Sequence, residues 1–427
     1  MLAFTLTYKE ISYKVMTTGS NHLNLNNLLL KYDMEELQLV KFDSVEMEKL
    51  GASVTAQEIY QQPELWEETY SIYKHSRDEV ETYLEEITNK HGQVRIIFTG
   101  AGTSAYVGKT VAPYLMEKLD ESKWSVESIP TTSIVSNPYQ YLQKDTPTLL
   151  VSFARSGNSP ESVATVDLAK EIVDDLYQMT ITCAAEGQLA QAAEGDDKNL
   201  LLLMPERSND QGFAMTGSYT CMTLTALLVF GSLDEKTEEE YVKQIIESGN
   251  QVLEQAEKVE NLLDTDFERI IYLGSGSLEG LAQEAQLKVL ELTAGQAEAS
   301  FESSLGFRHG PKSFVNQQTL IFGFVSNDSY TRKYDVDMLD ELRADDIAES
   351  ILAVQVDSAE KFEGDHFEIA EKASSLPDAF LALPYILFGQ LVSLHASIKL
   401  GHSPDNPSPA GTVNRVVKGV TIHEYKK

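Results

Sequence analysis

Two segments rich in glycine and hydroxyl side chains carry the residue types that could bind a phosphate group. The first runs TGAGTSAYVGKT from Thr99 to Thr110, and the second runs SFARSGNSPES from Ser152 to Ser162. Each follows an apolar run and precedes a helix-like pattern. Unpaired backbone N–H groups and the helix dipole at a helix N-terminus both favour an anion. The loops therefore predict a site for a small phosphorylated molecule, unless their hydroxyls only cap the two helices.

The first loop also fits a different kind of site. Gly100, Gly102 and Ala105 satisfy the loose dinucleotide pattern G-x-G-x-x-[GA], and Glu127 lies near the end of the next expected strand. A nicotinamide-dependent enzyme is therefore a competing hypothesis. The second hydroxyl-rich loop favours a phosphate site, because a dinucleotide site does not require it.

The second half of the chain carries groups that could move protons. Lys288 and Glu291, in LKVLEL, are three residues apart and so share a helix face. By spacing alone they could be an ordinary ion pair. His309, in RHGP, precedes a Gly-Pro pair that indicates a fixed turn. An imidazole titrates near neutrality, although a lone histidine is usually structural.

Composition limits the possible partners. The 427 residues carry a net charge of -32, which disfavours nucleic acid and anionic membranes as partners. Neither Cys183 nor Cys221 lies in a CxxC or a zinc-like spacing, so we expect a reducing cytoplasm and no metal. The sequence calls for no cofactor, and no apolar run approaches the roughly 20 residues that span a bilayer.

The elements around these residues alternate between apolar strands and helices. After an expected helix over residues 54–88, short β-branched runs alternate with helical patterns, which is typical of a parallel sheet covered on both faces. VRIIFTGAGTS and RIIYLGSGS look like one unit used twice, so we expect two α/β halves related by duplication. Ligands of such sheets bind beyond the carboxyl ends of the strands, where the loops lie.

The same patterns divide the chain into five expected parts. Residues 1–46 read unlike the rest and could be a disordered extension, with Met34 or Met47 as an alternative start. An acidic helical connector, whose charges we expect to face solvent, separates the two halves. The last long helix, around AFLALPYILFGQLVSLHASIKL, contains Pro384, which favours a kink or break. The expected parts after the extension are a helical segment 47–90, a first subdomain 91–232, the connector 233–262 and a second subdomain 263–427.

The order of the motifs resembles the sugar isomerase (SIS) domain family of phosphosugar-binding proteins. GAGTSA and SFARSGNSPES are followed by GSGSLEGLAQEAQLKVLELTAG, FESSLGFRHGPKSF and NPSPAGTVNRVVKGVTI. The order is similar to the isomerase module of glucosamine-6-phosphate synthase. It is closer to bacterial galactosamine-6-phosphate deaminase/isomerases, also described as tagatose-6-phosphate ketose/aldose isomerases. The resemblance covers about residues 47–425 and implies two tandem SIS subdomains, each a three-layer αβα unit.

The resemblance also implies roles for particular residues. Glu291 matches the general base, His309 the histidine that opens the sugar ring, and Lys418 a C-terminal lysine that reaches into the site. In the synthase-like arrangement the histidine comes from a neighbouring subunit, so a homodimer or higher homo-oligomer with shared active sites is expected. The positions that match substrate-binding residues are Gly102, Thr103, Ser104, Arg155, Ser156, Asn158, Ser159 and Lys288.

Some positions depart from the family pattern or stay open. Where the family often has S-Q-S-G-E-T, this chain has Ala154 and Arg155, which removes one hydroxyl and adds a cation. Arg155 could contact the phosphate or face solvent, and we favour the contact. His395 fits packing better than chemistry, Asp405 lies in family-like surroundings, and Glu302 could be a second acid.

The resemblance implies a cofactor-independent enzyme that converts galactosamine 6-phosphate into tagatose 6-phosphate and ammonia. Two alternatives remain open: an aldose–ketose isomerase of a neutral sugar phosphate, and a phosphosugar sensor without catalysis. A full amidotransferring synthase is not expected, because the chain lacks an N-terminal nucleophilic cysteine and a glutaminase domain. The sequence alone does not distinguish galacto from gluco sugars.

Overall fold

Two five-stranded parallel sheets repeat one topology in the computed structural model, which describes residues 42–358, 360–408, 411 and 419–426. The first sheet has the strand order β2-β1-β3-β4-β5 and the second the order β10-β9-β8-β6-β7. Read from the other edge, the second order is the first one repeated. Every paired strand in both sheets is parallel. The expected pair of α/β subdomains is confirmed.

The strands of the first sheet are β1 (Val94–Thr99), β2 (Trp124–Ser128), β3 (Thr148–Ala154), β4 (Leu176–Thr182) and β5 (Asn199–Leu203). Those of the second are β6 (Arg269–Leu273), β7 (Glu298–Glu302), β8 (Thr319–Phe324), β9 (Ser350–Val356) and β10 (His366–Ile369). The sequence patterns did not predict β7 and β10. Both are edge strands, and their sequences EASFE and HFEI carry charged residues instead of an apolar run.

The larger helices are α4 (Ser53–Tyr60), α5 (Gln62–His91), α6 (Thr103–Lys118), α9 (Pro160–Ile172), α11 (Gly217–Phe230), α12 (Glu235–Glu254), α14 (Ser277–Leu292), α15 (Ser329–Asp345) and α16 (Asp378–Lys399). Shorter ones are α3 (Ser44–Lys49), α7 (Thr131–Ser136), α8 (Pro138–Tyr141), α10 (Gln188–Ala193) and α13 (Ala256–Leu262). The described residues also include the 3-10 turns η1 (Glu206–Ser208), η2 (Gly306–His309), η3 (Pro311–Phe314) and η4 (Glu371–Ser375).

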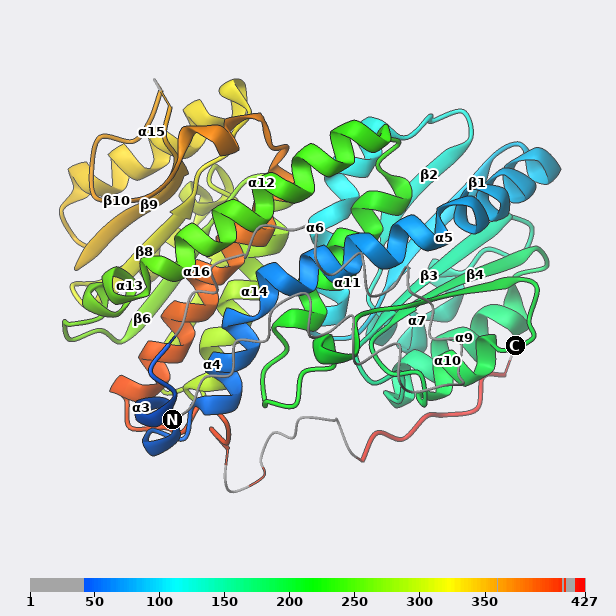
Figure 1. Ribbon diagram of the computed structural model, residues 1–427, viewed down its shortest axis with the longest axis horizontal. Coiled ribbons are helices and arrows are strands. Elements are labelled where there is room, and N and C mark those ends of the chain that lie inside the picture. Colours follow the sequence, from blue (N-terminus) through cyan, green and yellow to red (C-terminus); the bar gives the residue numbers. More distant parts are fainter. Residues whose placement is uncertain (1–41, 359, 409–410, 412–418, 427) are drawn as a thin grey trace, which may run out of the picture. The chain divides into compact units, whose positions relative to one another are not determined.

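Each sheet is covered by helices on both faces. In β1, Ile96 and Phe98 point into a large core shared with α6, α11 and α16, whereas Ile97 points into a separate core with α9. In β6, Tyr272 points into the same large core, whereas Ile271 points into a separate core that includes α15. Figure 1 shows α6, α11, α14 and α16 between the two sheets. The two halves therefore share one helical layer and one central core.

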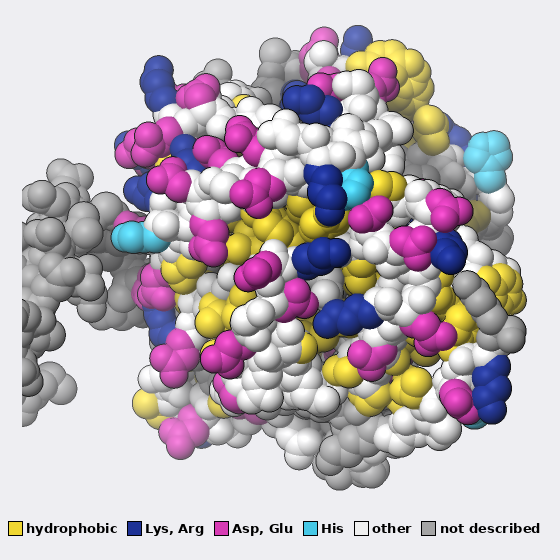
Figure 2. Space-filling model, turned by 90° about the vertical axis from the view of Figure 1, so that its right-hand side faces the viewer, with side chains coloured by type: hydrophobic (Ala, Val, Ile, Leu, Met, Phe, Trp, Pro, Cys, Tyr) yellow, Lys and Arg dark blue, Asp and Glu magenta, His cyan; other side chains and the backbone are white. Residues whose placement is uncertain are grey.

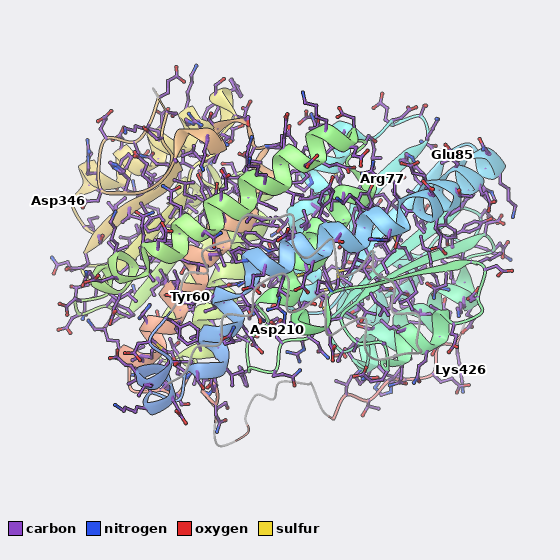
Figure 3. All side chains as sticks on the ribbon, in the orientation of Figure 1. Tyr60, Arg77, Glu85, Asp210, Asp346 and Lys426 are labelled. Atoms are coloured by element: carbon purple, nitrogen blue, oxygen red, sulfur yellow. The ribbon has the colours of Figure 1, made fainter. Side chains whose placement is uncertain are left out.

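Four expectations about the helices need correction. The helix expected over 54–88 is two helices that meet at Gln61, with a proline in the first turn of α5. The apolar segment FAMTGSYTCMTLTALLVFGSL predicts one long helix from Phe213, but α11 begins only at Gly217. The charges of the connector do not all face solvent. Glu238 of α12 is buried and pairs with Arg77 of α5; Figure 3 labels Arg77. Finally, α16 continues through Pro384 without a break.

The expectation that no apolar run approaches the length of a membrane span is wrong: α16 is long and apolar enough to cross a membrane by length and composition. Its apolar window is wholly buried inside the fold, where it packs against α14 and α12. The composition of α16 is therefore that of a core helix. At the surface, Figure 2 shows acidic side chains spread over the face in view, with Lys and Arg between them. On this face the acidic side chains do not form a single patch, as expected for a solvated surface.

Candidate active site

The two hydroxyl-rich loops lie side by side because β1 and β3 are neighbouring parallel strands. The first loop leads from β1 into α6, and the second leads from β3 into α9. Both helix N-termini therefore point to the carboxyl edge of the sheet at its topological switch point. Gly102 precedes α6 with φ +56°, a left-handed conformation that favours glycine. Thr103 and Ser104, the first two residues of α6, are both buried.

The second loop is tightly folded. Gly157 has φ +66°, and Asn158 accepts a hydrogen bond from the backbone N–H of Gln188 at 3.1 Å. Ser159 precedes α9, which starts with a proline, and its hydroxyl donates to Glu161 at 2.9 Å. Ser156 and Ser159 are partly exposed at this edge. The loop thus presents hydroxyl groups on a backbone whose shape is set by its neighbours.

Arg155 does not face solvent, because its side chain is buried at the end of β3. Its charge lies close enough to Cys183 to lower the pKa of that thiol, although burial has the larger effect and raises that pKa to about 12. The solvent-facing alternative for Arg155 is therefore wrong. A contact between Arg155 and phosphate stays a prediction.

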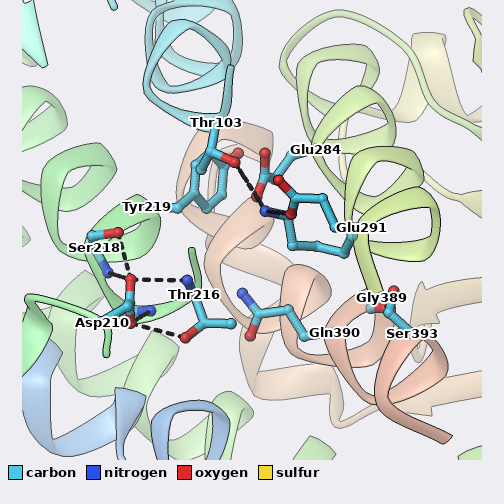
Figure 4. Close-up of polar contacts among 12 residues, drawn as sticks. Thr103, Asp210, Thr216, Ser218, Tyr219, Glu284, Glu291, Gly389, Gln390 and Ser393 are labelled. Carbon is cyan, nitrogen blue, oxygen red and sulfur yellow. Dashed lines mark hydrogen bonds and ion pairs between the residues drawn. The ribbon is translucent and has the colours of Figure 1, made fainter. Parts of the chain in front are cut away.

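A buried cluster from α14 meets the N-terminus of α6 (Figure 4). The Lys288 ammonium lies 2.6 Å from Glu291 and 3.2 Å from Glu284, and it donates to the Thr103 hydroxyl at 2.9 Å. The Thr103 hydroxyl in turn donates to Glu284 at 3.2 Å. The lysine side chain is 1% exposed, whereas the Glu291 side chain is 24% exposed. Glu291 is thus the member of the cluster that a ligand at this edge could reach.

The halves approach closely enough to form this cluster because of a glycine. A Cβ atom at Gly280 of α14 would lie 2.7 Å from the backbone N of Thr110 in α6, so only glycine permits this helix crossing. The crossing brings Thr103 of the first half to Lys288 of the second half. The cluster therefore exists only in the assembled fold.

Burial and charge act against each other in this cluster. Burial raises the pKa of Glu284 to about 8, and Lys288 lowers it only in part. Burial alone would lower the pKa of Lys288, but the two carboxylates, Glu284 first, raise it above its ordinary value. The carboxylates outweigh burial and keep Lys288 charged, since its ammonium lies 2.6 Å from Glu291. The cluster therefore combines a lysine that keeps its charge with a buried acid, Glu284, that tends to keep its proton.

Glu284 was not identified from the sequence. A signal was available, because Glu284 lies four residues before Lys288 in AQEAQLKVLEL and shares its helix face. Nothing in that spacing says that the position is buried. Burial, which comes from α6 and the central core, is what changes the chemistry of this carboxyl.

His309 lies at the end of η2 and is exposed to solvent. The segment that carries it is fixed to α15: Arg308 lies 2.6 Å from Glu341, and Lys312 lies 2.5 Å from both Glu341 and Asp345. Gly310 has φ +128°, which a side chain would strain. The imidazole is thus presented outward on an anchored turn.

The remaining candidates have structural partners or lie outside the described residues. Asp405 accepts hydrogen bonds from the backbone of Val54 and Thr55 and so caps α4. Glu302 accepts one from the backbone of Ser303, at the end of β7. His395 is buried in α16, and burial lowers its pKa. Lys418 lies outside the described residues.

Two further observations concern cofactors. Glu127, which a dinucleotide ribose would need, pairs with Arg95 of the neighbouring strand β1. Among the residues the structure describes, no three His, Cys, Asp or Glu side chains are grouped as metal ligands.

Comparison with known proteins agrees with this geometry. The SIS domain family model matches residues 87–230. The chain is 40% identical over 404 residues to the D-galactosamine-6-phosphate deaminase AgaS of Shewanella sp. (strain ANA-3), covering 94% of this chain and 100% of the relative. It is also 40% identical to the D-galactosamine-6-phosphate deaminase AgaS of Escherichia coli, with coverages of 87% and 96%.

A solved structure supports the same relationship. The tagatose-6-phosphate ketose/aldose isomerase from Escherichia coli superposes with a TM-score of 0.81 at 36% identity, covering 91% of this chain and 100% of that one. The similarity therefore extends over both subdomains and is not confined to the phosphate loops. The chain belongs to the SIS-domain family of D-galactosamine-6-phosphate deaminases.

Proposed function

We propose that this protein is an enzyme that converts galactosamine 6-phosphate and water into tagatose 6-phosphate and ammonia. The observation that carries the proposal is the Lys288–Glu291 pair at the N-terminus of α6, in a chain 40% identical to a named deaminase along that relative's whole length. The pair joins a partly exposed carboxylate to a buried cation beside a phosphate-type loop. That combination suits proton transfer next to an oxygen on which negative charge develops.

The phosphate binds at the carboxyl edge of β1 and β3. The groups proposed to bind it are the hydroxyls of Ser104, Ser156 and Ser159 and the backbone of Gly102 and Asn158. Thr103 belongs to the first loop. Its hydroxyl also bonds Lys288 and Glu284, and so connects the proposed phosphate site to the acid/base cluster. Arg155 supplies a fixed cation at the end of β3. Holding the phosphate there sets the position of the sugar carbons relative to Glu291.

The chemistry requires one carboxylate to move a proton between two neighbouring carbons. After the ring opens, Glu291 removes the proton from C2 of the amino aldose and returns it to C1. Lys288 pairs with Glu291 and holds that carboxylate in position while the enolamine forms. As the C2 proton returns to C1, the oxygen on C1 takes up a proton and the amine gives one up through water, so that a C2 imine forms. The imine then takes up water and releases ammonia, which leaves the C2 ketone of tagatose 6-phosphate. Each step uses only groups of this chain, the substrate and water.

Ring opening is assigned to His309, and it requires a second copy of the chain. The imidazole is exposed on the turn anchored to α15, which suits donation to the site of a neighbouring subunit. Lys418 is proposed to complete the site from the C-terminal tail. The enzyme is accordingly proposed to be a homodimer or higher homo-oligomer, acting in the reducing cytoplasm without a cofactor.

Ammonia release during turnover tests the proposal. We expect the purified protein to release one ammonia for each tagatose 6-phosphate formed from galactosamine 6-phosphate, with weaker activity on glucosamine 6-phosphate and none on N-acetylated 6-phosphates. The E291Q variant should lose about 10²–10⁴-fold in kcat while it still binds the substrate. The matched control is E298Q, at an exposed glutamate on β7 that pairs with Arg269; its kcat should stay at the wild-type value.

The outcome also separates the alternatives. Ketose formed from a neutral aldose 6-phosphate without ammonia from the amino sugar would indicate a simple isomerase. Tight binding of the amino sugar with no turnover in the wild-type protein would indicate a sensor. Either result would overturn the deaminase assignment.

A further inference from the structure

The second half repeats the loop geometry of the first half at the equivalent place. Gly276 precedes α14 with φ +58° and ψ -123°, and Gly102 precedes α6 with φ +56° and ψ -129°. A Cβ atom at Gly274 would meet the carbonyl oxygen four residues later at 2.4 Å, and one at Gly100 would meet its equivalent at 2.6 Å. With the identical strand order, the loops after β6 and β8 correspond to the two phosphate loops after β1 and β3.

A carboxylate occupies the space between the two corresponding loops of the second half. Asp335 of α15 accepts hydrogen bonds from the Ser275 hydroxyl at 2.6 Å and from the backbone N–H of Ser326 at 3.0 Å. These donors come from the loop after β6 and the loop after β8. A third bond, at 2.5 Å, comes from the Ser304 hydroxyl after β7. Asp335 is 2% exposed, so its carboxylate is buried between the loops.

The rest of the second loop is also closed by side chains of the chain itself. Asp378 of α16 accepts from the Ser326 hydroxyl at 2.5 Å and from the backbone N–H of Asn327 at 2.7 Å. Arg332 of α15 donates to the Ser326 carbonyl at 2.8 Å. Burial raises the pKa of Asp335 to about 6, which still leaves the carboxyl charged at neutral pH. The donors that a phosphate would use are therefore satisfied by fixed anions.

The first half has no such carboxylate at the matching position. Asp335 lies seven residues after the N-cap of α15, Asp328, and the residue seven positions after the N-cap of α9, Ser159, is Val166. Val166 packs into the apolar core beneath the first sheet. The two halves thus differ at this position, which holds a carboxylate in α15 and an apolar side chain in α9.

We propose that Asp335 is a built-in substitute for the phosphate in the second half, so that each chain holds one phosphosugar, in the first half only. The location of the substrate in the first half rests on the proposed function. The role of Asp335 as a substitute for phosphate does not. Duplication would have produced two anion cradles, and the carboxylate keeps the second one folded and closed. The second half is then free to supply Glu291 and Lys288 to the first.

Removal of the carboxylate should reopen the cradle to a free anion. In the full-length D335S variant, the space between the loops is vacated while a small polar residue remains. We expect D335S to unfold at a lower temperature than wild type. We also expect 20 mM sodium phosphate to raise its melting temperature at least twice as far as it raises that of the wild type, relative to sodium chloride of equal ionic strength. The D335N variant fills the space and should respond to phosphate as the wild type does.

Two further measurements keep the test decisive. If D335S is recovered only as insoluble protein, its refolding yield in phosphate and in chloride is compared, and a higher yield in phosphate supports the proposal. The S275A/D335S double variant should lose the extra response. Equal responses of wild type, D335S and D335N would show Asp335 to be an ordinary structural carboxylate. In wild type, binding of two phosphosugars per chain would also overturn the proposal, whereas failure to bind any phosphosugar would count against the proposed function alone.

Discussion

Replacing Lys288 by methionine tests whether the buried cation compensates Glu284. The methionine keeps most of the side-chain volume but removes the ammonium that lies 3.2 Å from Glu284, 2.6 Å from Glu291 and 2.9 Å from Thr103. Breaking a buried ion pair costs about 3–5 kcal/mol when the remaining charge stays buried. Here Glu291 is partly hydrated, and Glu284 carries no buried charge as long as it keeps its proton. At pH 6 we therefore expect K288M to lose only about 1–3 kcal/mol of unfolding free energy, the cost of lost charged hydrogen bonds.

The pH dependence carries the distinctive part of this prediction. The pKa of Glu284 is raised from 4.5 to about 8 in the fold, so the stability it contributes is present below pH 4.5 and is lost as pH rises through 8. Without Lys288 that pKa rises further, and K288M continues to lose stability above pH 8, where the wild type has stopped losing it. The difference between the two proteins should therefore be constant up to about pH 8 and then widen by about 1.4 kcal/mol per pH unit.

Urea denaturation at pH 6, 7, 8 and 9.5 measures this difference. The matched control is K236M, because Lys236 forms only an exposed pair with Glu240 and its side chain is 84% exposed. Its difference from wild type should stay near zero at every pH. A K288M difference that is flat or narrows between pH 6 and 9.5 would refute the reasoning, because it would mean that Lys288 does not compensate a buried acid.

Three further predictions follow from single contacts. In E284Q, the amide cannot ionise, so the unfolding free energy should fall less between pH 5 and 8 than it does in the wild type. Urea denaturation across this range measures it, and a dependence on pH as steep as that of the wild type would contradict the assignment of Glu284. In G280V, the new side chain meets the α6 backbone at Thr110, so the halves must separate; we expect a loss of about 1–3 kcal/mol in unfolding free energy and a fall in kcat, and unchanged values of both would show that the helix crossing tolerates a side chain. In D405A, loss of the cap on α4 should cost about 1 kcal/mol and leave kcat and KM unchanged, whereas a large fall in kcat with normal stability would place Asp405 in the chemistry.

Local sequence patterns predicted an element correctly where its residue types directly reflect its surroundings in the fold. The buried strands β3 and β8 are nearly all apolar, since parallel strands are covered on both faces, and the glycines of both loops mark the turns that need them. The edge strands β7 and β10 were missed because an edge does not require an apolar run. The break expected at Pro384 did not occur, because Pro384 lies in the buried apolar part of α16, which packs against other helices.

By itself, the sequence determined the class of fold, its duplication and the two loops that suit a phosphate, since each depends on residues close together in the chain. It also placed Lys288 and Glu291 on one helix face. Only the tertiary structure decided that Thr103 joins them, that Glu284 is a buried acid, that Arg155 is turned inward and that Asp335 fills the second cradle. These properties depend on burial and on contacts between segments far apart in the chain, such as the crossing of α6 and α14 at Gly280, and no local pattern encodes how deeply a side chain will be buried.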